Sequence, residues 1–509
     1  MRDLWSKPLV WMTLAIGIAF AYTWMSPQVT APNERTRIYL SLALLDGNVS
    51  VTDQVEKYGK PFDISKRGGE FYTDKAPGSS VIALPFIAGY QLLGGGDSME
   101  KLNVFVRRWV MVPFALLSFL LVRVISLSSG ASRQSANIAS IFFAIGTSFF
   151  HYGSAFYGHA LVTFFSLLAA WAVIKSLDAE DQRWRSAWQF SAGFAGACAF
   201  AVEYQAVVIC VALAMGFLTV RAHRRIRAIL APLLGASVPI GLTLLYNNAA
   251  FGGFLKTGYA HLPHAASRQN HVEGIYGVSL PSLEGLYGLL FTPSRGLLLC
   301  APIVLLGFFG LAHLWRRCRW LAVYAAISMV GLLFLMGGAD AWFGGWAFGP
   351  RLLVPIFGLA AISAAITLDA IENRWPSLLA AVIGWLVAGV LYNVFVSTMF
   401  PELPPSVTAP LRMVAMPLAE MGAPSPNIGM VWLGLSGLWS LVPLALIVVG
   451  LLVYAIWPLR PRGVATLQAS AFFVLAVVLS GIFAYGYPGD DARGEKFAER
   501  RATYRIHPE

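Results

Sequence analysis

Two acidic residues stand beside long apolar segments, where a carboxylate can do chemistry. Glu34 follows the first apolar run of the chain, and Glu203 occupies a tight turn between two later runs. A carboxylate at such a place can act as the general base that takes a proton from an attacking hydroxyl group. The simpler interpretation of Glu34 is a solvated helix N-terminus, where an early acid suits the helix dipole. The simpler interpretation of Glu203 is that its side chain reaches water from the turn between the two runs.

Cations stand at comparable positions. Lys75 directly precedes the apolar stretch 79–93, Arg351 opens a later apolar run, and Arg295 lies in a short loop before another. A basic side chain at a helix N-terminus can bind phosphate, because the helix end already favours an anion. For Lys75, an interfacial anchor is an equally good interpretation. Acids and cations at one face of a membrane protein suit activation of an acceptor by a base and stabilisation of an anionic leaving group.

Aromatic residues and histidines accompany these charges. The segment 149–159 contains His151 and His159 with two tyrosines, and the segment 337–351 places Trp342 and Trp346 among paired glycines, close to Asp340. Tryptophan at an interface is usually a membrane anchor, although its ring also offers a face on which a sugar can stack. The histidines lack the i, i+4 spacing of a helical metal pair, and no third ligand is evident. We therefore predict no metal site.

The composition identifies the kind of chain that must position these residues. Of 509 residues, 57% are hydrophobic and only 12% are charged, whereas a soluble domain has about 25% charged residues. Disordered, fibrous and ordinary globular proteins are thereby excluded, and an all-α polytopic membrane protein is predicted. The four cysteines all lie in or beside apolar runs, and their spacing indicates neither a disulfide framework nor a metal site.

Thirteen apolar runs are candidates for membrane spans, each of which needs roughly 20 residues. The stretch 79–93 is shorter, and we expect it to lie at the interface or to be re-entrant. The predicted spans are 8–25, 105–127, 135–151, 159–175, 187–201, 205–220, 228–247, 296–314, 319–337, 350–368, 376–397, 430–456 and 464–487. We expect the first run to be a retained anchor rather than a cleaved signal peptide, because its apolar region is long and no small-residue cleavage site follows.

The basic residues orient this topology. With 79–93 outside the membrane, the turns at one face contain 17 of the 37 Lys and Arg residues, whereas the short turns 152–158, 202–204 and 338–349 contain none. Short cytoplasmic loops carry the Lys and Arg excess, so that face is predicted to be cytoplasmic, with the N-terminus inside and the C-terminus outside. The formal net charge of +11 is then a topology signal, and no nucleic-acid partner is expected.

No repeat or low-complexity linker divides the chain, and we predict one integrated membrane domain over residues 1–509. Within it, 26–104 is the first external loop and contains candidate site residues. The segment 105–397 is the core bundle, and 398–509 comprises an external loop, two spans and an external tail. The external loops are expected to form a cap over the site.

Five segments together resemble a known family. They are Asn33-Glu34-Arg35-Thr36-Arg37, Tyr72-Thr73-Asp74-Lys75-Ala76-Pro77, Gly158-His159-Ala160-Leu161, the turn from Gly196 to Glu203, and Gly349-Pro350-Arg351-Leu352-Leu353. In this order they resemble motifs of the membrane glycosyltransferases of the GT-C fold, in the branch that holds protein O-mannosyltransferases and lipid A aminoarabinose transferases. His159 stands where that family has an aspartate. The segment from about 376 to 509 has no recognisable motif.

The resemblance implies an inverting transfer of a sugar from a polyprenyl-phosphate donor to a lipid, glycan or protein acceptor. The reaction would take place at the periplasmic face of a bacterial plasma membrane and need no obligatory cofactor. It implies catalytic roles for Glu34 and His159, and binding of the donor phosphate by Lys75, Arg351, Arg295 and Tyr72. The sugar or acceptor pocket would then include Arg37, Asp74, Glu203, Asp340, Trp342 and Trp346.

Two other function classes stay open on the sequence. A transporter or flippase of a lipid-linked saccharide would also place charged groups in a helical bundle. Such proteins have broken or polar segments at corresponding positions of two halves, and we detect no such symmetry. A non-catalytic membrane scaffold would leave Glu34, Lys75 and Arg351 without a shared purpose. The sequence therefore favours an enzyme at the lipid–water boundary.

Overall fold

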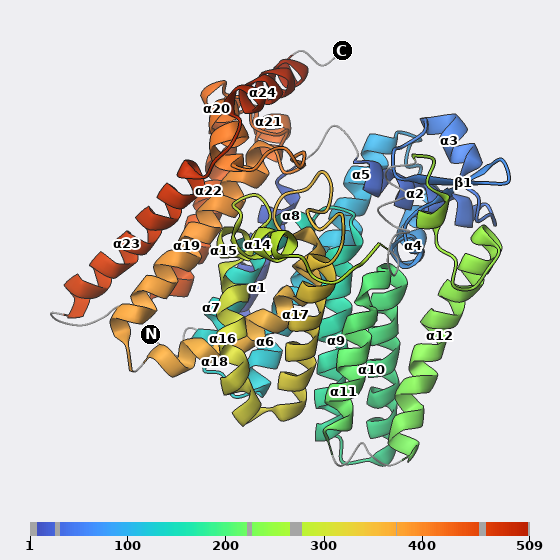
Figure 1. Cartoon of the computed structure of the whole chain (residues 1–509), viewed down its shortest axis with the longest axis horizontal. Coiled ribbons are helices and arrows are strands. Elements are labelled where there is room, and N and C mark those ends of the chain that lie inside the picture. Colours follow the sequence, from blue (N-terminus) through green and yellow to red (C-terminus); the bar gives the residue numbers. More distant parts are fainter. Residues whose placement is uncertain are drawn as a thin grey trace.

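The computed structural model describes residues 8–25, 31–220, 226–264, 277–372, 374–457 and 465–506. Long helices run side by side through most of the molecule, and shorter elements gather at its upper end (Figure 1). The all-α class predicted from the composition is confirmed; the sheet in the described part is one two-stranded hairpin. Several basic turns used to orient the topology, including 221–225 and 458–464, lie outside the described residues.

Eight helices of the described chain are long and apolar enough to cross a membrane, which makes this a multi-pass membrane protein. They are Met99–Ser128, Gly158–Asp178, Ala228–Phe251, Arg319–Gly337, Arg351–Glu372, Pro376–Met399, Gly437–Ile456 and Gln468–Gly486. Helices that are shorter or more polar occupy the other five predicted ranges: α1 (Pro8–Thr23), α7 (Arg133–Ile145), α10 (Gln182–Val202), α11 (Val207–Leu218) and α16 (Pro302–Arg317). The count of thirteen spans stays a prediction.

Two predicted spans are interrupted where the backbone turns. The run 430–456 is divided into α21 (Ile428–Leu433), the 3₁₀ segment η8 (Gly437–Leu441) and α22 (Val442–Ile456), because Gly434 takes a left-handed conformation with φ 65°. The run 296–314 is divided into α15 (Leu297–Cys300) and α16 at Ala301, just before Pro302. Apolar composition alone does not register these breaks.

Small residues let the bundle helices pack closely. A Cβ added at Gly193 in α10 would lie 1.9 Å from the carbonyl oxygen of Pro232 in α12 (Ile226–Phe251). A Cβ at Gly307 in α16 would lie 2.3 Å from the carbonyl oxygen of Ala360 in α18 (Phe357–Glu372). Close approach of backbones at glycine is how membrane helices gain contact area where the lipid supplies no hydrophobic drive. The other bundle helices are α6 (Val112–Ser128), α9 (Gly158–Asp178), α17 (Arg319–Gly337), α19 (Pro376–Met399) and α23 (Ala465–Gly486).

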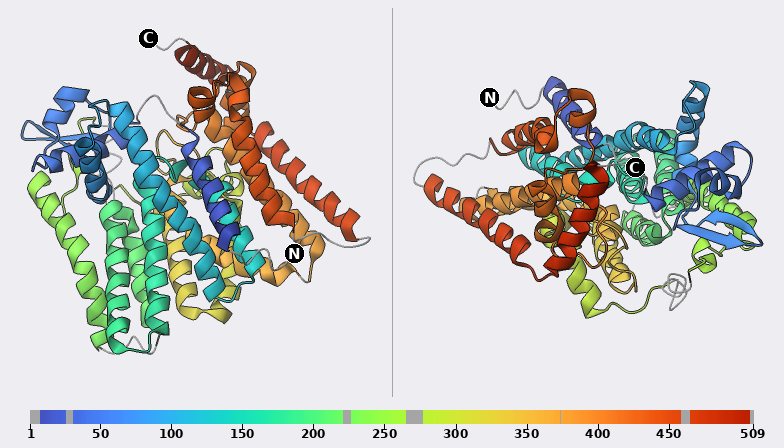
Figure 2. Two further views of the ribbon diagram at one scale, coloured as in Figure 1. Left: turned by 180° about the vertical axis from the view of Figure 1, so that it is seen from behind. Right: turned by 90° about the horizontal axis from the view of Figure 1, so that it is seen from above.

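The segment after α1 forms a compact cap at the upper end of the bundle (Figures 1 and 2). It contains α2 (Pro32–Leu45), α3 (Thr52–Tyr58), the antiparallel hairpin of β1 (Ile64–Arg67) and β2 (Glu70–Thr73), α4 (Gly78–Leu92) and α5 (Met99–Val106). The hairpin pairs Ile64 with Thr73 and turns at Gly68 and Gly69, both with positive φ. The apolar stretch 79–93 is thus helix α4, which packs against α2.

The C-terminal elements complete the same end. After α19 come the π-helical segment η7 (Leu411–Ala415), α20 (Met416–Glu420), α21 and, beyond α23, the terminal helix α24 (Asp491–Ile506). Figure 1 shows α20, α21 and α24 at the end of the molecule that also holds α2 and α4. The short elements α8 (Phe149–Tyr152), η2 (Arg107–Met111), η3 (Tyr204–Ala206), η5 (Gly258–His261), α14 (Leu283–Phe291) and η6 (Arg351–Ile356) connect the helices.

Candidate active site

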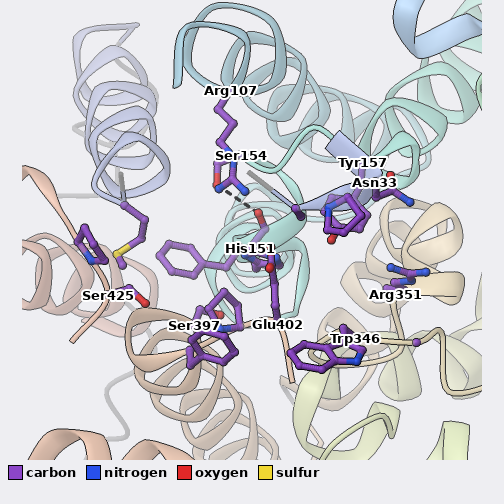
Figure 3. Close-up of a pocket in the computed structure, with 18 of the residues that line it drawn as sticks. Asn33, Arg107, His151, Ser154, Tyr157, Trp346, Arg351, Ser397, Glu402 and Ser425 are labelled. Atoms are coloured by element: carbon purple, nitrogen blue, oxygen red, sulfur yellow. Dashed lines mark hydrogen bonds between the residues drawn. The ribbon is translucent and has the colours of Figure 1, made fainter. Parts of the chain in front are cut away.

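A cavity of about 640 Å³ lies at the end of the bundle where the cap and the C-terminal elements meet. Its wall comes from segments far apart in the chain: the end of α1, residues 31–33 and 62–63, η2, residues 150–157, the loop 345–351, the segment 397–402, residues 425–426 and α24. Figure 3 shows Arg107 and Ser154 on one side, Arg351 on another, and Glu402 with Trp346 across from Arg107. Ligand sites of membrane and soluble proteins commonly have this size.

Arg351 is the cation of this cavity that is best placed to bind an added anion. It opens η6 directly after Pro350, and Gly349 (φ 68°) turns the chain while its amide donates to the carbonyl of Ser294 at 2.8 Å. The guanidinium lies 5.5 Å from the ring centre of Tyr157. Among the described residues no carboxylate forms an ion pair with it, and its Nε is buried without a hydrogen-bond partner. A buried donor without a partner is costly unless a ligand supplies the acceptor.

Lys75, predicted to bind the donor phosphate, is held behind the cavity wall by two carboxylates. Its Nζ lies 2.8 Å from Asp74 Oδ2 and 3.2 Å from Asp63 Oδ2. Burial alone would raise the pKa of Asp63, but Lys75 and Arg351 outweigh it and hold that pKa below its usual value. Asp63 itself lines the cavity. Lys75 therefore acts on the cavity through Asp63, and Asp74, one of the predicted pocket residues, shares this ion cluster.

Glu34 is buried beside the cavity, and both of its carboxylate oxygens accept hydrogen bonds from the protein. Oε1 accepts hydrogen bonds from Arg107 Nε and from the amide of Phe156, both at 2.7 Å, and Oε2 accepts from Arg107 Nη2 at 2.7 Å. Oε2 also accepts from Asn103 and from the amide of Ala31, each at 3.3 Å. The side chain is 0% exposed. This geometry fixes α2 against η2, and Glu34 itself does not line the cavity. The base function predicted for Glu34 stays a prediction.

A second buried ion pair lies between the cap and the bundle. Arg37 donates from Nη2 to Glu203 Oε1 at 2.5 Å, from Nε to Asn33 at 2.9 Å and from Nη1 to Ser79 at 2.8 Å. Burial alone would raise the pKa of Glu203, but the guanidinium of Arg37 outweighs it and lowers that pKa. Arg37 and Glu203 do not line the cavity, although Asn33 does. The pair links α2, α4 and the turn after α10.

The remaining predicted residues divide between the cavity and the frame around it. Trp346 lines the cavity and is half exposed, with Arg501 of α24 lying 5.8 Å from its ring centre. His159 is buried outside the cavity, where its ring stacks on Tyr157 with centroids 6.4 Å apart and its Nδ1 lies 3.5 Å from Gln205 Nε2. Tyr72 packs edge-on against Phe251.

Three residues from the loops after α14 and α17 also lie outside the cavity. Arg295 donates its guanidinium to the carbonyls of Phe343, Ser294, Gly345 and Leu403 at 2.8–3.2 Å. Asp340 is exposed, and Trp342 fills the space over Gly288. Arg295 is thus committed to backbone carbonyls rather than open to a phosphate, and it ties the loop 343–345 to residue 403.

Glu402 is a cavity residue that sequence reasoning missed. It follows Pro401 in the segment after α19, its side chain is partly buried, and Figure 3 shows it beside His151 and Trp346. Burial, with a contribution from Glu34, raises the pKa of Glu402 to about 7. The only signal in the sequence is an acid between Pro401 and Pro404, and the recognisable motifs end before this segment. Asp63 and Arg107 were also missed, because they fall between the motifs and none includes them.

One cavity thus contains Arg351, which can bind an anion, and the carboxylates of Asp63 and Glu402. Such a site can bind a phosphate and accept or donate a proton. Within the described ranges no three His, Cys, Asp or Glu side chains lie close enough together to hold a metal ion. The expectation of a metal-independent site stays a prediction.

Comparison with known proteins gives structural neighbours only. No family model matches the chain, and no curated protein matches it significantly. The solved structures that it resembles include ArnT from Cupriavidus metallidurans bound to undecaprenyl phosphate, at 14% identity and a TM-score of 0.46, covering 94% of this chain and 77% of that one.

Two further neighbours cover smaller shares of their own chains. The Archaeoglobus fulgidus oligosaccharyltransferase matches at 11% identity and a TM-score of 0.48 over 82% of this chain and 58% of that one. The arabinosyltransferase EmbB from Mycobacterium smegmatis matches at 13% identity and a TM-score of 0.48, over 100% of this chain and 42% of the EmbB chain. All three are glycosyltransferases of the GT-C fold, the class that the sequence motifs resemble. At these identities and TM-scores no residue role or substrate is transferred to this chain.

Proposed function

We propose that this protein is an inverting glycosyltransferase that moves a sugar from a polyprenyl-phosphate donor to a hydroxyl acceptor at the external face of a membrane. The observation that carries the proposal is the cavity in which Arg351, without an ion-pair partner in the described part, faces two carboxylates, Asp63 and Glu402. The motif resemblance described above supports the same reaction. The site would lie on the periplasmic side of a bacterial plasma membrane.

The donor phosphate is assigned to Arg351. A guanidinium binds phosphate oxygens with charge-assisted hydrogen bonds, and its free Nε provides one donor of a bidentate pair. Lys75, which the motif resemblance also implies for this task, contributes by offsetting the charge of Asp63 next to the bound anion.

The wall of the cavity suits the rest of such a donor. Tyr22, Met25, Phe150 and Pro426 give it an apolar side near the end of α1, against which the first prenyl units can lie. Trp346 offers an aromatic face to the sugar ring. A volume of about 640 Å³ exceeds that of one sugar phosphate, so an acceptor hydroxyl can enter as well.

The chemistry follows from this placement. The acceptor oxygen attacks the anomeric carbon from the side opposite the phosphate, so the anomeric configuration is inverted. The bond between that carbon and the phosphate oxygen breaks, and its electron pair remains on polyprenyl phosphate. Arg351 stabilises the charge that develops on the leaving group, which is where preorganised cations give the largest rate gain. The acceptor is a lipid, a glycan or a protein, and the sugar is a hexose or a pentose.

A reconstituted assay tests the proposal. Purified protein in liposomes is incubated with a panel of polyprenyl-phosphate hexoses and pentoses and with acceptors of the three classes, and release of polyprenyl phosphate is followed. Arg351→Ala should weaken apparent donor affinity at least tenfold, while Arg351→Lys keeps the charge and loses only the bidentate geometry. Product with the donor's anomeric configuration would contradict inversion. Movement of donor across the bilayer without release of polyprenyl phosphate would favour the transporter alternative.

A further inference from the structure

Two carboxylates, Asp63 and Glu402, line the described wall of the cavity, and they differ in their hydrogen-bond and ion-pair partners. Asp63 is paired with Lys75 at 3.2 Å, and its pKa is held below the usual value. No hydrogen bond or ion pair holds Glu402 within the described part of the chain, although both residues line the same space. Glu34, the base predicted from the sequence, lies outside the cavity with five hydrogen bonds already accepted. A base must reach the acceptor and have a free lone pair.

The loop that carries Glu402 is fixed from both sides. The carbonyl of the next residue, Leu403, accepts hydrogen bonds from Arg295 Nη2 at 3.0 Å and from the amide of Ala347 at 2.9 Å. Arg295 also binds the carbonyls of Phe343 and Gly345, so one guanidinium connects the loop that bears Trp346 with the segment that bears Glu402. This gives Arg295 a positioning role and sets Glu402 beside the ring on which the sugar would stack.

We propose that Glu402 is the general base of the transfer reaction. The inference rests on the proposed function and names the residue that activates the acceptor. The acceptor hydroxyl gives its proton to a carboxylate oxygen of Glu402 while its oxygen forms the new bond to the anomeric carbon. The old bond from that carbon to the phosphate oxygen breaks and leaves polyprenyl phosphate, and Glu402 later releases its proton to water.

The electrostatic surroundings of Glu402 agree with this role. Burial and then Glu34 raise its pKa, Arg107, Arg501 and Arg351 lower it, and the net result is a pKa of about 7. The other titratable side chains that line this space, besides the arginines, are Tyr22, Asp63, His151 and Tyr157. Tyr152 lies outside the cavity wall and interacts with Glu402 electrostatically. A base with a pKa near the working pH combines a useful ionised fraction with proton affinity. The donor is a phosphodiester, which is ionised throughout this pH range and adds no titration of its own.

The test compares single-turnover transfer in liposomes by the wild type, Glu402→Gln, Glu402→Asp and Glu402→Ala, with Glu420→Gln as the control. Glu420 is an exposed acid of α20 in the same external region. In Glu402→Gln the single-turnover rate constant at saturating donor should fall about 10²-fold or more, with little change in the donor concentration that gives half the maximal rate. Formate should restore part of the rate of Glu402→Ala, because a small carboxylate can enter the space that the side chain leaves. Glu420→Gln should match the wild type.

The pH dependence of the wild-type rate and the activity of the wild type itself complete the test. The wild-type rate should fall as the pH drops below about 7, because protonation of Glu402 removes the base; a rate that stays flat from pH 5 to 8 overturns the inference even if every variant misfolds. Wild-type transfer together with an undiminished rate in Glu402→Gln would also overturn it, while leaving the proposed function intact. Absence of transfer by the wild type with every donor would instead count against the proposed function.

Discussion

The guanidinium of Arg107 binds both carboxylate oxygens of Glu34, with Nε–Oε1 and Nη2–Oε2 each 2.7 Å apart. Glu34 lies in the first turn of α2 and Arg107 begins the π-helical segment η2, so one ion pair joins the cap to the first long helix after it. Single π turns inside helices are frequent at functional sites. Here the wider turn stands immediately before Val112 and Pro113 and presents Arg107 to both Glu34 and the cavity.

Glu34→Gln should destabilise the protein as well as reduce transfer. The change leaves Arg107 buried without its counter-ion, and breaking one side of a buried pair costs about 3–5 kcal/mol. Denaturant unfolding in detergent measures the loss, and the double variant Glu34→Gln/Arg107→Gln should recover most of it because no charge is left unpaired. An unchanged unfolding curve with abolished transfer would instead support the catalytic role that the sequence predicts for Glu34.

Gly78→Ala should separate α4 from the bundle. A Cβ at Gly78 would lie 2.5 Å from the carbonyl carbon and oxygen of Ala201, and this backbone cannot move without shifting the turn that bears Glu203. Overpacking of this kind costs about 1–3 kcal/mol. Gly89→Ala in the same helix is the matched control, because nothing lies within 4 Å of its Cβ. Equal unfolding midpoints for the two variants would show that α4 does not pack here.

The parts of this structure that the sequence predicts are those that depend on local composition. Runs of about twenty apolar residues mark the helices, and the shorter stretch before Leu93 marks α4, because length decides whether a helix can span a bilayer. Arg351 and Trp346, predicted from one short segment, do line the cavity. Asp63, Arg107 and Glu402 do not follow from any local pattern, since 339 residues separate the first from the last and only the packed fold brings them together.

The ion pairs show what the motifs leave out about the charged residues Glu34, Arg37 and Lys75. A motif records that Glu34, Arg37 and Lys75 stand near the membrane, but not which opposite charge each meets. In the fold Glu34 meets Arg107, Arg37 meets Glu203, and Lys75 meets two aspartates. Burial and pairing limit what each group can do in a reaction, because a paired buried charge has few hydrogen-bonding positions free for a substrate.

The Arg37–Glu203 pair should make stability depend on pH below about 4.5. Arg37 lowers the pKa of Glu203 in the folded state against the opposing effect of burial, so the pair stabilises the protein at pH values above the unfolded pKa. This contribution is lost as the pH falls through the lower folded value. The Tm of Glu203→Gln should therefore lie below that of the wild type at pH 7, with a gap that narrows below pH 4.5. For Glu420→Gln, an exposed acid, no such gap is expected; a gap for Glu203→Gln that widens in acid would contradict the assignment.

Arg501→Ala should loosen the terminal helix over the cavity. The guanidinium lies 4.9 Å from the ring centre of Phe400, 5.3 Å from Phe497 and 5.8 Å from Trp346, so it joins α24 to the cavity wall. Cation–π contacts contribute about 0.5–2 kcal/mol each, depending on how far they are desolvated. Loss of these contacts should raise the donor KM several-fold in the liposome assay. It should also speed trypsin cleavage after Lys496, which is exposed but lies within the folded helix α24. Arg500→Ala is the control, because Arg500 is exposed on the same helix. If both variants resist trypsin equally and keep the wild-type KM, α24 is not a functional part of the cavity wall, and its packing at the upper end of the molecule serves the fold alone.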